Sequence, residues 1–177
     1  MDPDTYTRVA QPCLQVLASV LEPRAAIYVA GPLETGREFY ERRAPSASSV
    51  RRRNQERMSA FVATLRRQTA APVIDPGLLR VPNWPSAFYG RFFLAVIDEF
   101  AREAWFLDGW EYSRGATSEF VHCASRQIPC RDERGGPLEC SHAYALIKRS
   151  ARCIASLGHD ASRFEARLES LDALTRD

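Results

Sequence analysis

The hydrophobic positions of this chain follow two different spacings. In several segments apolar residues recur every three or four positions, which is the spacing of one face of an α-helix. Between these segments lie short continuous apolar runs that end at proline or glycine, which is typical of buried strands. The pattern predicts helices at 9–21, 50–69, 88–103, 115–126, 138–157 and 160–175, and strands at 25–30, 72–76, 104–108 and 127–130.

The order of these segments predicts the fold class. Strands alternate with helices up to about residue 130, which favours an α/β domain with a parallel sheet covered on both faces. The two predicted helices of 131–177 form a C-terminal helical extension, whose apolar stripes suit either a cap on the same domain or a dimer interface. Pro12 lies inside the first helical pattern, so the regular helix is expected to start only there. The polar stretch 33–49 is either a functional lid or a disordered insertion.

Composition narrows the class of protein. The chain has 177 residues, of which 45% are hydrophobic and 26% charged, as in one globular domain. The net charge of +2 gives no reason to expect a nucleic-acid partner, although 23 of the 24 basic residues are arginine. No apolar run reaches the roughly 18 residues of a membrane span, and the N-terminus lacks a signal-peptide pattern. We therefore expect a cytoplasmic protein whose five cysteines are reduced thiols.

The segment GWEYSRGATSE, residues 109–119, is the most informative stretch for chemistry. It follows a predicted strand and runs into a predicted helix, an arrangement that presents backbone N–H groups to an anion. Glu119 lies in the first turns of that helix, where a carboxylate would sit close to the bound group. Chemistry on a phosphorylated or sugar-bearing small molecule is the expectation.

Two motifs together resemble a known family. The first predicted strand ends in Tyr28-Val29-Ala30-Gly31-Pro32, a YxxGP pattern, and the second motif reads GWExSxGAxxE. With these motifs, residues 26–130 resemble the nucleoside 2-deoxyribosyltransferase superfamily, in particular its phage and bacterial branch. The resemblance implies a Rossmann-like or flavodoxin-like sheet of about four or five strands. It also implies cleavage of the N-glycosidic bond of nucleosides or nucleotides, without a cofactor or metal.

The resemblance also implies roles for individual residues. Glu119 would attack the anomeric carbon, Tyr28 would position it by a hydrogen bond, and Gly31 would allow close approach of the substrate. Members that act on nucleotides have a serine six residues before the glutamate, where it binds the 5′-phosphate; here that residue is Ser113. A nucleoside 5′-monophosphate is therefore the expected substrate, because a hydroxyl at a helix start can donate to phosphate. The other expected substrate-binding residues are Pro32, Tyr89, Gly109, Arg114 and Gly115.

Glycosidic cleavage passes through an oxocarbenium-like state, which a nearby carboxylate stabilises or captures, and a second acid could protonate the leaving base. Asp98 is the first candidate for this acid and Asp75 the second. The acceptor is either water, as in a hydrolase, or another base, as in a deoxyribosyltransferase. Neighbours in this family often complete each other's sites, so a homodimer is expected.

Other interpretations of the same residues stay open. Glu119 could serve only as a helix-start carboxylate, Ser113 as an N-cap and Tyr28 as a core residue. A non-catalytic nucleotide sensor would need the Ser113 turn but not Glu119, and a dinucleotide is a further possible substrate. Three further sets of residues also allow a functional and a structural interpretation. Trp84, Phe88 and Tyr89 could stack on a base or belong to the core, and Arg51, Arg52 and Arg53 could clamp a phosphate or form a solvated helix face. A zinc site is less favoured than buried free thiols for the set His122, Cys123, Cys130, Cys140 and His142.

Overall fold

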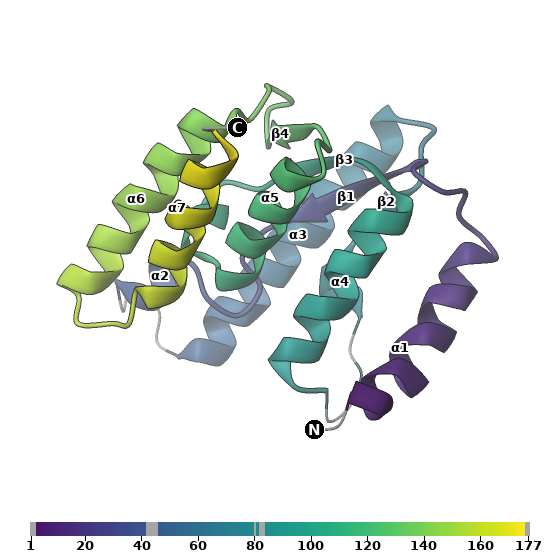
Figure 1. The fold of residues 1–177 in the computed structure, drawn as a ribbon, viewed down its shortest axis with the longest axis horizontal. Helices are drawn as coiled ribbons and strands as arrows, with labels where there is room; N and C mark the ends of the chain where they lie inside the picture. Colours follow the sequence, from purple (N-terminus) through teal and green to yellow (C-terminus); the bar gives the residue numbers. More distant parts are fainter. Residues whose placement is uncertain (1–2, 42–45, 80, 82–83, 176–177) are drawn as a thin grey trace.

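A single parallel sheet forms the centre of the protein (Figure 1). The computed structural model describes residues 3–41, 46–79, 81 and 84–175. Neighbouring strands are parallel throughout, in the order β2-β1-β3-β4. This flavodoxin-like order confirms the predicted α/β class and makes the β1–β3 junction a topological switch point, where such sheets bind ligands. The strands are β1 Ala26–Ala30, β2 Val73–Ile74, β3 Ala101–Phe106 and β4 Cys130–Asp132.

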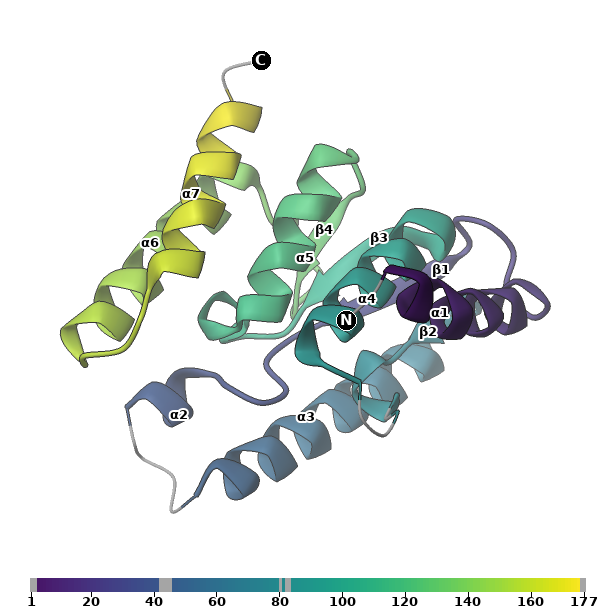
Figure 2. The same cartoon turned by 60° about the horizontal axis from the view of Figure 1, so that its bottom comes forward.

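Helices cover both faces of the sheet (Figures 1 and 2). Helix α3 lies on one face, whereas α1, α4 and α5 lie on the other, and α6 and α7 form an outer hairpin beside α5. None of the helices in the described ranges is long and apolar enough to cross a bilayer. The α-helices are α1 Pro3–Ala18, α2 Arg37–Tyr40, α3 Ala47–Gln68, α4 Ser86–Phe100, α5 Arg114–Ser125, α6 Cys140–Ser156 and α7 Ser162–Leu174; the 3-10 turns are η1 Pro76–Leu78 and η2 Trp110–Tyr112.

Strand alternation divides the buried side chains between the two faces. Because successive side chains of a strand point to opposite faces, Ile27 and Val29 of β1 join the core under α3. Tyr28 joins the larger core, which also contains residues of α4, α5 and the C-terminal hairpin. All five residues of β1 are buried, so Tyr28 lies in a strand that is shielded from solvent along its whole length.

Several predicted boundaries were wrong. Helix α1 begins at Pro3 and passes through Pro12, so Pro12 does not start it. Strand β3 begins at Ala101, not at 104, because Ala101–Glu103 pair with the start of β1 despite fitting the preceding helical pattern. Strand β4 is 130–132, not 127–130, since Gln127 adopts a positive φ of 55° that ends the turn after α5. Of the stretch 33–49, the structure describes α2 and the beginning of α3, whereas residues 42–45 lie outside the described ranges.

The C-terminal hairpin packs on its own chain. Ile147 and Ile154 of α6 and Phe164 and Leu171 of α7 are completely buried in the larger core. The Ser150 hydroxyl of α6 also donates to the backbone carbonyl of Glu111 at 2.7 Å. The apolar stripes of these two helices therefore form a cap on the same chain and not a dimer interface.

Candidate active site

Tyr28 and Glu119 meet between the sheet and α5, although 91 residues separate them in sequence. The Tyr28 hydroxyl donates to Glu119 Oε1 at 3.0 Å. Glu119 lies in the second turn of α5 and is half-buried, whereas Tyr28 is completely buried in β1. The two residues that the motifs singled out for attack and positioning are thus brought together in one hydrogen bond.

The surroundings of this pair favour a neutral carboxyl group. Burial raises the pKa of Glu119 to about 7, although the hydrogen bond from Tyr28 acts in the opposite direction. Burial, followed by the charge of Glu119, raises the pKa of Tyr28 well above its usual value, so its hydroxyl remains a donor. A carboxyl group that titrates near neutrality can exist as a nucleophile or an acid under mild conditions.

The turn before α5 is shaped as the motif requires. Gly109 adopts a positive φ of 82°, a conformation that glycine enters without steric penalty. Ser113 then caps α5, since its Oγ accepts from the backbone N–H of Ala116 at 3.3 Å. A side chain added at Gly115 would meet only Ser113 Oγ, 3.9 Å away, so the helix start is open at this point. Arg114 beside it is exposed.

Gly31 is required by packing between protein side chains. A Cβ at Gly31 would lie 3.1 Å from Met58 Cε and 3.2 Å from Leu107 Cβ. Close contact with these two residues of the smaller core is therefore sufficient to explain the glycine. The next residue, Pro32, and Gly109 line a hollow of about 180 Å³ at the switch point, together with Gly36, Arg37, Glu38, Val50, Asn54, Arg57 and Asp108.

The two candidate acids are in different surroundings. Asp98 Oδ1 lies 2.9 Å from His122 Nε2 and 3.1 Å from Arg126 Nε, beside the last turns of α5. Asp75 directly follows β2, the neighbour of β1, and burial raises its pKa. Its Oδ1 accepts a hydrogen bond from the backbone N–H of Gly77 at 2.8 Å.

The aromatic residues near 84–89 are tied into the structure. The Tyr89 hydroxyl accepts from the N–H of Val81 at 2.8 Å and donates to its carbonyl at 2.9 Å. The Tyr89 ring stacks on Phe93, whose ring centroid is 6.3 Å from that of Tyr28. Trp84 packs edge-on against Phe88, Tyr89 and Phe92. These rings form a continuous wall from Tyr28 of the sheet to Trp84.

The arginine run at the start of α3 is engaged in ion pairs within the protein. Arg51 binds Glu34, and Arg53 Nε donates to Glu38 Oε2 at 3.0 Å. Both glutamates belong to the 33–41 segment, so these arginines hold that segment against α3. Arg52 lies 3.8 Å from Glu56 on its own helix.

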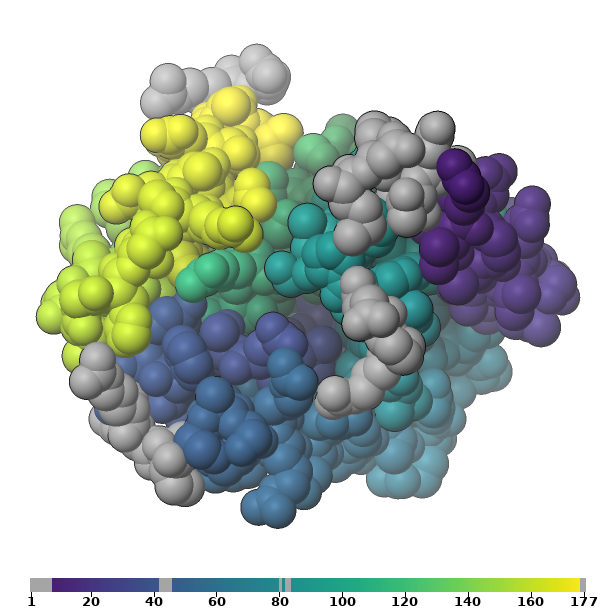
Figure 3. Space-filling model, turned by 90° about the horizontal axis from the view of Figure 1, so that it is seen from below, coloured from purple at the N-terminus to yellow at the C-terminus, as the bar shows by residue number. Residues whose placement is uncertain are grey.

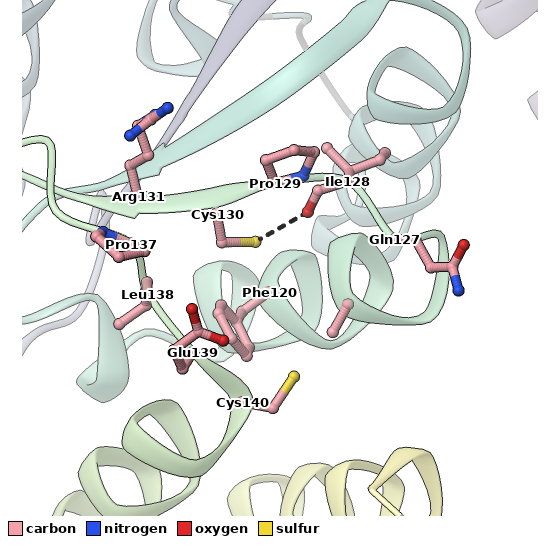
Figure 4. A pocket seen from close by; sticks show the side chains of 11 residues that line it. Phe120, Gln127, Ile128, Pro129, Cys130, Arg131, Pro137, Leu138, Glu139 and Cys140 are labelled. Carbon is pink, nitrogen blue, oxygen red and sulfur yellow. Dashed lines mark hydrogen bonds between the residues drawn. The ribbon is translucent and has the colours of Figure 1, made fainter. Parts of the chain in front are cut away.

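Cys130 and Cys140 line a separate hollow of about 320 Å³ between α5, β4 and the start of α6 (Figure 4). Cys130 Sγ points to the Ile128 carbonyl at 3.5 Å, and Cys140 lies across the hollow. A hydrogen bond with Cys130, followed by burial, raises the pKa of the Cys123 thiol far above its usual value, which makes it a poor ligand or nucleophile. Within the described ranges, no three His, Cys, Asp or Glu side chains are grouped to bind a metal.

Sequence reasoning missed an ion pair between a buried glutamate of the motif, Glu111, and the partly exposed Arg37. Glu111 is only 3% exposed, burial raises its pKa, and Arg37 Nη2 of α2 lies 3.6 Å from its Oε1. The Arg37 guanidinium also lies 5.1 Å from the centre of the Tyr112 ring. No local periodicity links position 37 to position 111, so only the fold reveals that α2 covers the turn before α5.

Known proteins add no identification to this geometry. Comparisons of the chain with protein-family models, with curated proteins and with solved structures find no match.

Proposed function

We propose that this protein is an N-glycosidase that cleaves a nucleoside 5′-monophosphate into free base and a (deoxy)ribose 5-phosphate. The hydrogen bond between Tyr28 and Glu119 is the observation that carries the proposal. It joins residues from the two motifs that resemble the deoxyribosyltransferase superfamily, in the roles that the resemblance implies. The carboxyl group is also half-buried and titrates near neutrality, as expected of a group that reacts.

In the proposed first step, a Glu119 carboxylate oxygen attacks the anomeric carbon as the bond to the base nitrogen breaks. The electron pair of that bond leaves with the base, which takes a proton from a second acid. We assign this role to Asp75, because burial raises its pKa and because it directly follows Ile74, the partner of Tyr28 in the sheet. Asp98 is instead held by a histidine and an arginine.

In the proposed second step, water attacks the glycosyl ester and releases Glu119. Asp75 accepts the proton from this water, so the enzyme returns to its starting state. Tyr28 donates to the same carboxylate throughout and therefore stabilises it as a leaving group. A second base in place of water would give base exchange, which is the chemistry of a deoxyribosyltransferase.

The start of α5 supports a phosphate-bearing substrate. Its first N–H groups and the open space beside Gly115 suit an oxyanion, since a helix start favours negative charge. Ser113 is already an N-cap, so a role in phosphate binding would require its hydroxyl to donate outward while its lone pair accepts from Ala116. A homodimer is part of the proposal, but it must use a surface other than the buried hairpin stripes.

The decisive experiment supplies ribo- and deoxyribonucleoside 5′-monophosphates to the purified protein and follows free base by chromatography. Glu119→Gln is the inactive comparison, and Glu165→Gln, an exposed residue of α7, is the matched control. We expect base release by the wild type and the control, and at least a ~10³-fold loss in Glu119→Gln. A second free base added to the assay distinguishes exchange from hydrolysis. Release at the wild-type rate by Glu119→Gln contradicts the proposal.

A further inference from the structure

The C-terminal hairpin carries opposite charges on its two helices. Helix α6 contains three basic residues, Lys148, Arg149 and Arg152, and no acidic residue. Helix α7 carries Glu165 and Glu169, which lie four residues apart and therefore on one side of the helix. All five residues are exposed, and none forms an ion pair with another residue that the structure describes. They form a basic row on α6 and an acidic row on α7.

The other basic residues of α7 do not cover the acidic row. Arg163 and Arg167 lie two residues from the glutamates, and residues two positions apart point to nearly opposite sides of a helix. The exposed positions beside the two rows carry small side chains, namely Ala145, Ala155, Ala166 and Ala173. These small side chains leave room for a second helix at close distance, with the arginine stems packed over them.

Both rows face away from the core of the protein. Ile147 and Ile154 of α6 and Phe164 and Leu171 of α7 are completely buried, and the charged residues occupy the other sides of these helices. The hairpin lies at the opposite end of the molecule from α1 (Figures 1 and 3). Seen from below, the yellow side chains of α7 form an open face at that end (Figure 3). A partner can therefore reach the two rows from solvent.

The two rows match in height when they are measured from the turn of the hairpin. Arg149 lies seven residues before the last residue of α6, and Glu169 lies seven residues after the first residue of α7. Arg152 and Glu165 lie four and three residues from the same two helix ends. With a rise of about 1.5 Å per residue, the first pair lies about 10 Å from the turn and the second about 5 Å. Opposite charges on α6 and α7 therefore occur at equal heights.

We infer that the exposed face of the α6–α7 hairpin binds the same face of a second copy of this chain. A two-fold axis parallel to the hairpin places α6 of each protomer against α7 of the other. Because the heights match, Arg149 then faces Glu169 of the partner subunit, and Arg152 faces Glu165 of the partner subunit. The symmetry repeats both contacts. A two-fold axis across the hairpin would instead place α6 against α6 and bring like charges together.

The inferred interface is small and polar. Exposed ion pairs each contribute little to stability and are screened by salt, so the dimer should be weak and salt-sensitive. The interface lies in the C-terminal extension, outside residues 26–130, and is turned away from the core that contains Tyr28. The inference rests on the homodimer of the proposed function, but it does not require base release.

The test measures the molecular mass of the full chain by sedimentation equilibrium at protein concentrations up to about 0.5 mM. Wild type should dimerise at low salt, and about 0.5 M NaCl should raise the Kd of the dimer at least ~10-fold. Two double variants reverse one row each, Arg149→Glu with Arg152→Glu and Glu165→Arg with Glu169→Arg. Each should raise the Kd at least ~100-fold, because like charges then meet across the interface. An equimolar mixture of the two variants should dimerise again, because each protein then meets its opposite charge.

A matched control separates pairing at this surface from a change in net charge. Arg52→Glu with Arg67→Glu reverses two exposed arginines of α3 and should leave the Kd of the dimer unchanged. Thermal unfolding of all variants confirms that they are folded, since each replaced side chain is exposed.

Three results overturn the inference. They are a monomeric wild type at low salt, a dimer that persists in both row variants, and a mixture of these variants that stays monomeric. A monomer that binds a short DNA oligonucleotide through Arg149 and Arg152 overturns it in favour of a polyanionic partner. Base release by a monomer leaves the proposed activity standing without this interface. A dimer with the expected charge dependence but without base release from any nucleotide overturns the proposed activity and leaves this inference standing.

Discussion

Two carboxyl groups at α5, one in its first half and one beside its last turns, have opposite surroundings. In the first half, Glu119 is half-buried and receives a hydrogen bond from the neutral Tyr28 hydroxyl. Beside the last turns, Asp98 keeps 38% of its side-chain surface exposed and has both His122 and Arg126 as partners. Burial raises the pKa of the first carboxyl group to about 7, whereas the second has two basic side chains as partners. We therefore propose Glu119, which has fewer charged partners, as the reactive carboxyl group of the two.

The largest expected effect is on the rate of base release, and it should distinguish Asp75, the proposed acid, from Asp98. Asp75→Asn should lower kcat by about 10²-fold or more, because the amide cannot give a proton to the leaving base. Asp98→Asn should change kcat less than about 3-fold, since Asp98 only pairs with residues of the last turns. Steady-state kinetics with the preferred nucleotide measures both values. Equal losses of kcat in the two variants would contradict the assignment of the acid role to Asp75.

A second effect concerns stability as a function of pH. The folded-state pKa of Glu119, about 7, exceeds the ordinary value of 4.5, so the folded protein keeps a proton that the unfolded chain releases in between. The free energy of unfolding of the wild type should therefore fall as pH rises from 4.5 to 7. Glu119→Gln lacks this penalty and should be more stable than the wild type by about 2–3 kcal/mol above pH 7.

Urea unfolding at pH 5 and pH 8 measures this difference. The gain in Glu119→Gln should be small at pH 5 and largest at pH 8, and exposed Glu165→Gln should show no such pH dependence. A stability gain of equal size at both pH values would mean that ionisation of Glu119 does not destabilise the folded protein.

A smaller effect should appear in the pH profile of Tyr28→Phe. The Tyr28 hydrogen bond lowers the pKa of Glu119, so its removal should raise that pKa further. Because the attacking form is ionised, the rising limb of the kcat profile should move to higher pH in the variant. The loss of rate should thus be greater at pH 6 than at pH 8. A profile that falls by the same factor at every pH would assign Tyr28 a role other than tuning Glu119.

The smallest effect is expected from the pair at the other end of the helix. Arg126→Ala should lower the free energy of unfolding by less than about 1 kcal/mol, because both partners of this ion pair are well exposed. Raised salt should reduce the difference between the variant and the wild type further. Chemical unfolding at low and high salt tests this, and a loss of several kcal/mol would show that Asp98 and Arg126 hold α4 and α5 together.

Local sequence patterns predicted the parts of the protein that depend on local spacing. The parallel α/β class, the short buried strand at Tyr28 and the helix that carries Glu119 all follow from periodicity and from glycine and proline positions. The start of β3 was missed because Ala101–Glu103 become extended only through pairing with β1. The contrast between Asp75 and Asp98 depends on where β2 and the last turns of α5 lie, which no local pattern specifies. The same is true of the Arg37–Glu111 pair.

The position of Tyr28 in β1 also sets the timescale on which the candidate site can change. Its strand has a parallel neighbour on both sides, so its backbone is released to solvent only when the whole sheet opens. Helix α2, in contrast, has four residues and can exchange its amide hydrogens through local opening. The hydrogen bond from Tyr28 to Glu119 should therefore persist for as long as the protein stays folded. Local opening of α2 therefore need not break the hydrogen bond between Tyr28 and Glu119.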